Sequence, residues 1–332
     1  MTPHKKTAVI VNPHASSGRA RKKWPVISKR LEARIGPFTT RFTERPGHAT
    51  LLARELLSQG FDLIVTAGGD GTFNEVANGF LDRGSPVNSE AVLGILPIAT
   101  GGDFQRSLGI GARIEDAIEV IASGMPGWID MGRVVCTARD GSLRERYFLN
   151  LVSFGMGGAV ASRAKNFLSF LGGKVAFLWA TFLVLLRYRG KSVSLFLDDS
   201  PQPICAFVTN IAVGNGQFHG GGMHPCPSAM LNDGLLDITV IDYMPFLRLV
   251  REIKILYSAN VLRHPKVHAF RAAKIVAEGD PETLIEVDGE PLGALPLEIT
   301  ILPTMIKVLT GPIHSRRSSK FPPGILQEKG LT

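Results

Sequence analysis

The first 130 residues alternate between two hydrophobic patterns, one typical of strands and one typical of helices. Short continuous apolar runs are separated by stretches whose apolar residues recur at helical spacing. The runs that predict strands are 7–11, 37–43, 61–67 and 91–96, and the helical stripes are 20–35, 49–57, 73–81 and 114–121. This alternation predicts a doubly wound α/β domain with a parallel sheet covered on both faces.

Strand patterns dominate the chain after about residue 130. Turns rich in Gly, Pro and Asp separate the strand-like runs, which are 147–154, 192–197, 206–213, 235–241, 283–287 and 297–302. Helical periodicity occurs at 167–186 and 246–262. The second half is therefore predicted to be mostly β.

The last apolar run, 305–309, is compatible with pairing in either half. The residues after Gly311 form a basic stretch without periodicity, as expected of a poorly ordered end. We expect a first domain at 1–130 and a second at 131–304. In the remaining segment, 305–332, a strand that is free to return to the first domain would precede the basic tail.

Composition narrows the class of protein. A chain of 332 residues with 45% hydrophobic residues has enough apolar material for two folded domains and is not disordered. The net charge of +8 suits an anionic partner such as nucleotide phosphates, an acidic membrane surface or nucleic acid. The three cysteines, Cys136, Cys205 and Cys226, are far apart and form no CxxC pair, which argues against a disulfide framework.

One apolar segment, 167–186, raises the question of a membrane contact. Gly172 and Gly173 interrupt it, and the uninterrupted part, 175–186, is too short to cross a bilayer comfortably. One interpretation is a buried helix between domains. The other is a helix that lies in the membrane interface, because Arg187, Arg189 and Lys191 follow at once and suit anionic headgroups.

The loop 66–75, with the sequence TAGGDGTFNE, carries the clearest chemical signal. It follows a predicted strand and begins a helix, the place where open α/β sheets bind ligands. Its glycines let the backbone approach an anion, and the carboxylate of Asp70 would then require a cation, such as Mg²⁺, between itself and nucleotide phosphates. The simpler alternative is a tight turn followed by a helix cap.

Two other polar loops follow strands of the same predicted sheet, at 12–18 and 97–104. All three loops should meet at one edge of the sheet, as they do in a nucleotide site. The sequence has no GxxxxGK[ST] pattern, so a P-loop enzyme is excluded. The first strand is not followed by GxGxxG, which disfavours a dinucleotide oxidoreductase.

The second half holds three further candidates. The segment 286–291 has three carboxylates within five residues, which would include a general base or form an acidic hairpin tip. The glycine-rich loop 214–222 is followed closely by His224 and contains His219, and these are either metal ligands or structural residues. The turn 232–234 could bind a hard cation through Asp233.

Taken together, these motifs resemble those of the diacylglycerol kinase catalytic-domain family, which includes sphingosine and ceramide kinases. The sequence GGDGTFNEVANG at 68–79 is similar to its signature, and NGQFHGGG at 215–222 with PSAMLNDGLLD at 227–237 is similar to its second-domain motif. Asn12, Thr43 with 47–49, the loop 97–104 and VDGEPL at 287–292 match other family motifs in order. The resemblance covers about 7–311. It departs at Ala99 and Gly102, where the family has Gly and Asn.

The resemblance implies a first domain like those of NAD kinase and phosphofructokinase and a β-sandwich second domain. It implies ATP as co-substrate and Mg²⁺, with Asp70 and Glu290 as catalytic residues and Glu290 as general base. The residues implied in binding ATP and its Mg²⁺ are Asn12, Thr43, Gly68, Gly69, Asp70, Gly71, Thr72, Phe73, Asn74 and Thr100. Met230, Asp233 and Leu235 match a structural Mg²⁺ site.

The expected function is phosphorylation of a lipid hydroxyl, most simply that of diacylglycerol or a related glycerolipid. A sphingoid-base or ceramide kinase, a NAD kinase-like enzyme and a non-catalytic lipid-binding regulator remain alternatives. We expect a cytoplasmic protein that contacts the inner face of the membrane peripherally. Nucleic acid is not an expected partner, because no recognisable binding module is present. The sequence leaves the oligomeric state open, and a homodimer is compatible with it.

Overall fold

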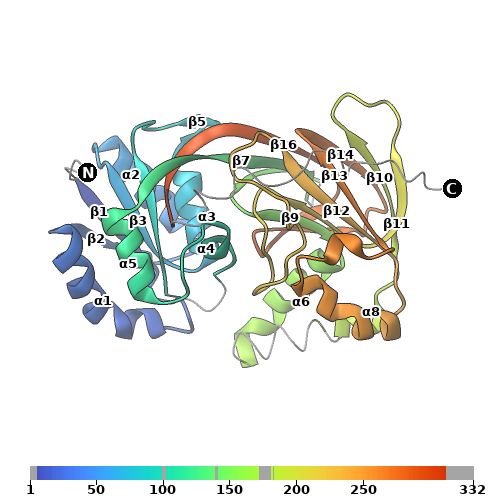
Figure 1. The fold of residues 1–332 in the computed structure, drawn as a ribbon, viewed down its shortest axis with the longest axis horizontal. Coiled ribbons are helices and arrows are strands. Elements are labelled where there is room, and N and C mark those ends of the chain that lie inside the picture. Colours follow the sequence, from blue (N-terminus) through green and yellow to red (C-terminus); the bar gives the residue numbers. More distant parts are fainter. Residues whose placement is uncertain (1–5, 99–101, 139–140, 172–180, 182, 312–332) are drawn as a thin grey trace.

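The computed structural model describes residues 6–98, 102–138, 141–171, 181 and 183–311. Its first half contains a parallel sheet of β6 (Val92–Pro97), β3 (Leu63–Gly68), β1 (Thr7–Val11) and β2 (Thr39–Phe42), in that order (Figure 1). The helices between these strands are α1 (Arg19–Ile35), α2 (His48–Ser58) and α3 (Asp70–Gly79), and α4 (Asp103–Ser107) and α5 (Ile114–Ser123) follow β6. Every residue of β3 is buried, as expected of a strand covered on both faces. The predicted α/β fold is confirmed.

The second half is mostly antiparallel β structure, also as predicted. Its strands are β7 (Met125–Thr137), β8 (Leu143–Phe148), β9 (Leu151–Gly155), β10 (Lys191–Leu197), β11 (Ile204–Gly214), β12 (Leu236–Asp242), β13 (Val267–Ala272), β14 (Lys274–Gly279), β15 (Leu284–Val287) and β16 (Glu290–Thr310). A separate apolar core fills this half, with Phe148, Phe154, Val208 and Ile299 among its buried members. A short hairpin of β4 (Leu81–Asp82) and β5 (Ser85–Pro86) extends the first half.

Strand β16 passes through both halves. It pairs antiparallel with β7 from Ala294 to Thr310, and near its end Lys307 and Val308 pair parallel with β6. The two halves therefore share one continuous sheet (Figure 1). The apolar runs 297–302 and 305–309, which the sequence separates, belong to this one strand, with a register shift between Leu302 and Ile306.

Several predicted elements differ from those in the structure. The predicted strand 147–154 is two strands, β8 and β9, because the chain turns at Leu149 and Asn150. The predicted helix 246–262 is the shorter α8 (Phe246–Glu252), followed by two 3₁₀ turns, Ile253–Tyr257 and Val261–Arg263. The sequence patterns did not predict β13, β14 or β7. In β7, Pro126, Gly127, Asp130 and Gly132 interrupt the apolar pattern.

The predicted helix 167–186 falls partly outside the described residues, which omit 172–180 and 182. Helix α6 (Met156–Leu171) begins before that range and follows β9 directly. Within the described residues, no helix is both long and apolar enough to cross a membrane.

Candidate active site

The predicted nucleotide loops meet at the carboxyl ends of β1, β2 and β3. Asn12 follows β1, and its amide Nδ2 donates a hydrogen bond of 3.0 Å to the hydroxyl of Thr72 on α3. Thr43 follows β2 and is buried, and its backbone N–H donates to the carbonyl of Val11. This edge therefore joins residues from three segments that are distant in the sequence.

Asp70 is the first residue of α3, and its carboxylate faces the start of α4. Its two oxygens accept hydrogen bonds from the backbone N–H groups of Asp103 (3.2 Å) and Phe104 (3.1 Å). Burial and the neighbouring Asp103 carboxylate raise the pKa of Asp70 above its usual value, although the backbone hydrogen bonds act in the opposite direction. Two carboxylates thus lie close together at this edge, an arrangement that favours a bound cation.

Asp103 links this edge to the second half. One of its oxygens accepts from the Arg106 guanidinium at 2.7 Å, and the other accepts from the backbone N–H of Gly221 at 2.8 Å. Gly221 lies in the glycine-rich loop between Gly220 and Gly222, and all three have positive φ angles of +61° to +117°. Residues with a Cβ rarely adopt such angles, so the loop needs glycine to bring its N–H to Asp103.

A second contact between the halves comes from the hairpin of β15 and β16. Asp288 and Gly289 form its two-residue turn, with φ angles of +47° and +86°, as expected for an Asp-Gly pair. The Asp288 carboxylate accepts from the backbone N–H groups of residues 149–151 at 2.8–3.2 Å and thereby fixes the turn between β8 and β9. It also accepts from Asn74 Nδ2 at 2.7 Å. Burial nevertheless raises the pKa of Asp288 to about 6.

The Asp288–Asn74 contact joins the hairpin that carries Glu290 to α3. Glu290 is the first residue of β16, is exposed, and pairs with Val287 across the hairpin. The hairpin that carries the predicted general base therefore touches α3, the helix that begins at Asp70. Asn74 is buried, and its amide also donates to the Tyr147 carbonyl at 3.0 Å, so its side chain bridges the halves.

His219 forms a buried ion pair beside this hairpin. Its Nε2 lies 2.7 Å from Oε1 of Glu286, and the Glu286 side chain is only 2% exposed. Burial alone would lower the pKa of His219, but the Glu286 carboxylate outweighs it, with help from Asp103 and Asp288, and the pKa rises to about 9. The raised pKa favours the protonated form of His219 beside these carboxylates.

The guanidinium of Arg271 lies beside the residues of the predicted structural metal site. Both the carboxylate of Asp233 and that of Asp237 accept from the guanidinium of Arg271, and Asp233 Oδ1 also accepts from the backbone N–H of Leu235 at 3.2 Å. Met230 is 38% exposed at the start of this turn. The metal site remains a prediction, and Arg271 would compete with an ion for Asp233.

The other predicted residues divide into three groups. Gly68 ends β3, and Gly69 precedes α3, which includes Gly71, so the glycines lie where the motif predicts. The ring of Phe73 is fully buried in the core, so only its backbone is available to a ligand. Thr100 lies outside the described residues.

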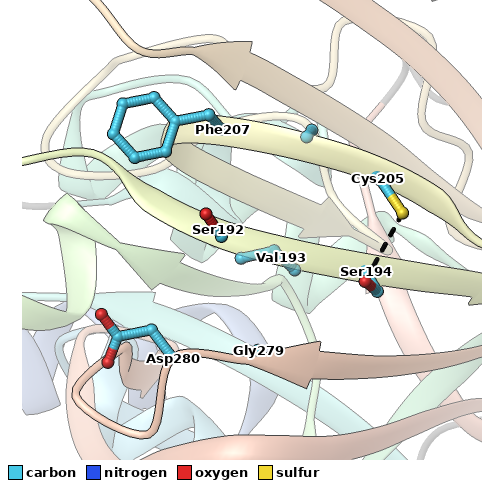
Figure 2. Close-up of a pocket in the computed structure, with 8 residues that line it drawn as sticks. Ser192, Val193, Ser194, Cys205, Phe207, Gly279 and Asp280 are labelled. Carbon is cyan, nitrogen blue, oxygen red and sulfur yellow. Dashed lines mark hydrogen bonds between the residues drawn. The ribbon is translucent and has the colours of Figure 1, made fainter.

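Sequence reasoning did not assign Asp103, Asp288 or the His219–Glu286 pair to the site, although each lies in a motif that it singled out. The signals were the Asp in the loop 97–104, the Asp-Gly turn and the lone histidine in a glycine-rich loop. An open hollow on the β10, β11 and β14 strands, lined by residues such as Phe207, Cys205 and Asp280, contains none of the predicted site residues (Figure 2).

Comparison with known proteins agrees with this architecture. Residues 6–134 match the family described as the diacylglycerol kinase catalytic domain, and residues 150–310 match the YegS C-terminal NAD kinase beta sandwich-like domain. The chain is 28% identical to a diacylglycerol kinase of Staphylococcus saprophyticus over 92% of this chain and 95% of the relative. It is 29% identical to a diacylglycerol kinase of Staphylococcus haemolyticus over 91% and 87% of the two chains.

Solved structures show the same fold. The structure of a diacylglycerol kinase from Bacillus anthracis, 23% identical in sequence, matches with a TM-score of 0.67 over 94% of this chain and 99% of the other. A second B. anthracis structure, 25% identical, matches with a TM-score of 0.73 and the same coverage.

Proposed function

The chain belongs to the diacylglycerol kinase catalytic-domain family, and from this premise we propose that it is an ATP-dependent lipid kinase. The acceptor would be the hydroxyl of diacylglycerol or of a related glycerolipid in a membrane that the protein contacts peripherally. The observation that carries this proposal is the Asp288–Asn74 hydrogen bond, because it holds the hairpin of Glu290 against the helix that begins at Asp70.

ATP would bind at the edge formed by Asn12, Thr43 and the loop 68–74. Thr100, which lies outside the described residues, is also proposed to bind it. The Asp70 carboxylate offers oxygen ligands of the kind that Mg²⁺ prefers, and the Asp103 carboxylate lies nearby. Because Asp103 is already paired with Arg106, Asp70 is the residue that fits the ion. Asp70 would hold the ion. When bound, Mg²⁺ would neutralise charge on the phosphates during transfer.

Glu290 would act as general base. The lipid hydroxyl would give its proton to the Glu290 carboxylate, and the hydroxyl oxygen would attack the γ-phosphorus of ATP. The bond between that phosphorus and the leaving ADP oxygen would break. Glu290 is exposed at the start of β16. Asp288 would position Glu290 indirectly. Asp288 lies two residues before Glu290 in the turn of the hairpin, and its carboxylate accepts four hydrogen bonds that hold this turn in place.

The test is transfer of labelled phosphate from ATP to a panel of dispersed lipids, with the product identified by mass. Asp70→Asn and Glu290→Gln should each lower turnover by about 100-fold or more, since the interactions they remove contribute several kcal/mol to such reactions. Glu298→Gln is the matched control, because it removes a carboxylate from the same strand that pairs with Lys274 on the surface. Transfer to NAD instead of lipid, or near-normal turnover in both variants, would refute the proposal.

A further inference from the structure

Helix α8 presents an apolar and basic face outside the candidate active site. Leu247 is 80% exposed and Val250 is 47% exposed, one helical turn apart on the same face. Arg251, also exposed, follows Leu247 by four residues, and Lys254 and Tyr257 are exposed in the 3₁₀ turn that follows. We call these five residues the α8 surface.

The α8 surface rests on a firmly packed base. Leu249 faces inward and packs with Leu256, Val261 and Leu185 in a small apolar cluster separate from the two main cores. The exposure of Leu247 and Val250 is therefore not the result of a frayed helix, because the opposite face of α8 is buried. An amphipathic helix usually exposes its polar face, whereas α8 carries apolar residues on its buried face and on its exposed face.

The charge of this region is mostly positive. Residues 246–263 contain four basic side chains, Arg248, Arg251, Lys254 and Arg263, and one acidic side chain, Glu252. The Glu252 carboxylate lies 3.1 Å from Arg248, 3.5 Å from Arg251 and 3.0 Å from His264, and the four basic side chains outnumber it. Leu185 of the same cluster is followed by Leu186, 48% exposed, and by the exposed Arg187, which extend the basic and apolar character.

We propose that the α8 surface docks the protein on an anionic lipid bilayer, with Leu247 and Val250 entering the headgroup boundary and Arg251 and Lys254 meeting anionic headgroups. This combination of exposed aliphatic side chains with excess positive charge is what an interfacial helix requires. The proposal rests on the proposed function in that it identifies how the kinase reaches a substrate that stays in the membrane.

The test is co-sedimentation with vesicles of phosphatidylglycerol and of phosphatidylcholine. The protein should bind the phosphatidylglycerol vesicles more tightly and lose that preference in high salt. The Leu247→Ser, Val250→Ser double variant should bind about tenfold or more weakly, since burial of an aliphatic side chain supplies energy of that order. Arg251→Gln with Lys254→Gln should weaken binding to phosphatidylglycerol by about 30-fold, at about 1 kcal/mol for each charge, and change binding to phosphatidylcholine little.

Leu51→Ser is the control, because Leu51 on α2 is 49% exposed and belongs to the other half of the chain. Equal vesicle binding by the double variant, the charge variant and the unsubstituted protein would overturn the proposal. So would a change in molecular mass, measured by light scattering, without a change in vesicle binding, since that would assign the α8 surface to a second copy of the chain. The charge variant decides the matter if the serine variant does not fold.

A parallel assay separates this proposal from the proposed function. Phosphate transfer to a short-chain diacylglycerol in free solution should be unchanged in the α8 variants, whereas transfer to lipid in phosphatidylglycerol vesicles should fall with binding. Binding that depends on α8 without transfer to any lipid would refute the kinase and leave the docking surface intact. Transfer from vesicles that is unaffected by the α8 variants would refute the docking surface alone.

Discussion

The His219→Gln substitution would test the buried ion pair between His219 and Glu286. In the folded protein the pKa of His219 rises to about 9, compared with 6.5 for an ordinary histidine, because the Glu286 carboxylate outweighs the cost of burial. A raised pKa means that the folded state holds the proton more tightly than the unfolded state does. The stabilisation is therefore complete below about pH 6.5 and disappears as the pH rises through about 9.

The size of this effect follows from the difference between the two pKa values. At about 1.4 kcal/mol for each unit, the shift corresponds to roughly 3 kcal/mol of stabilisation at pH 6.5 that is lost by pH 10. His219→Gln should remove this pH dependence. It should also destabilise the protein by about 3 kcal/mol or more at pH 7, because the buried Glu286 carboxylate would lose its partner. Glu286→Gln combined with His219→Gln should recover part of that loss.

Two measurements check this reasoning. The imidazole signals followed by NMR from pH 5 to pH 10 should include one that titrates near pH 9 and is missing from the His219→Gln variant. Urea unfolding at several pH values should show that the free energy of unfolding falls as the pH rises from 6.5 to 10, both in the unsubstituted protein and in the His224→Gln control. His224 lies two residues after the glycine-rich loop that contains His219, and its Nε2 is 3.2 Å from the amide oxygen of Gln217. A His219 signal that titrates at or below pH 6.5, or equal slopes with and without His219, would refute the argument.

Three further substitutions test other parts of the structure. Asp288→Ala should destabilise the protein by about 3 kcal/mol or more in urea unfolding, because four hydrogen-bond donors lose their acceptor, and a loss below about 1 kcal/mol would contradict this. Added Mg²⁺ should raise the melting temperature of the Arg271→Gln variant more than that of the unsubstituted protein, because the substitution removes the guanidinium from the carboxylates of Asp233 and Asp237. Equal responses would show that Arg271 does not compete with a metal. Gly132→Ala should lower the free energy of unfolding in urea by about 1–3 kcal/mol, because the added Cβ would clash with the buried ring of Phe148. Gly127→Ala on the same strand is the control, because its Cβ would enter open space. Equal stabilities of the two variants would contradict the clash.

The parts of the fold that the sequence predicted are those determined locally. The loop 66–75 can be recognised from the sequence because a buried strand, a glycine turn and a helix follow one another within a few residues. The Asp288–Gly289 turn is similarly local, since the pair favours the positive φ angles of a tight hairpin. Such motifs identified the α/β character of the first half and the mostly β character of the second, and they predict the edge where a ligand would bind.

The parts that the sequence did not predict depend on contacts between distant residues. Asn74 and Asp288 are 214 positions apart, so nothing near either residue indicates that their side chains meet. His219 and Glu286 acquire their ion pair in the same way, and a histidine in a glycine loop looks the same whether it is solvated or buried. Strand β7 was missed because Asp130 interrupts its apolar pattern, although the carboxylate is satisfied by the backbone N–H groups of Gly234 and Thr304.

The path of β16 has a consequence for how the chain folds during synthesis. Strand β6 is flanked by β3 on one side and by the end of β16 on the other, and β16 is the last of the described strands to leave the ribosome. Until then β6 is an apolar edge strand with an unpaired row of backbone groups, which is a template for aggregation. The first half therefore cannot complete its sheet before the second half has been translated, and we expect this protein to depend on chaperones while it is being made.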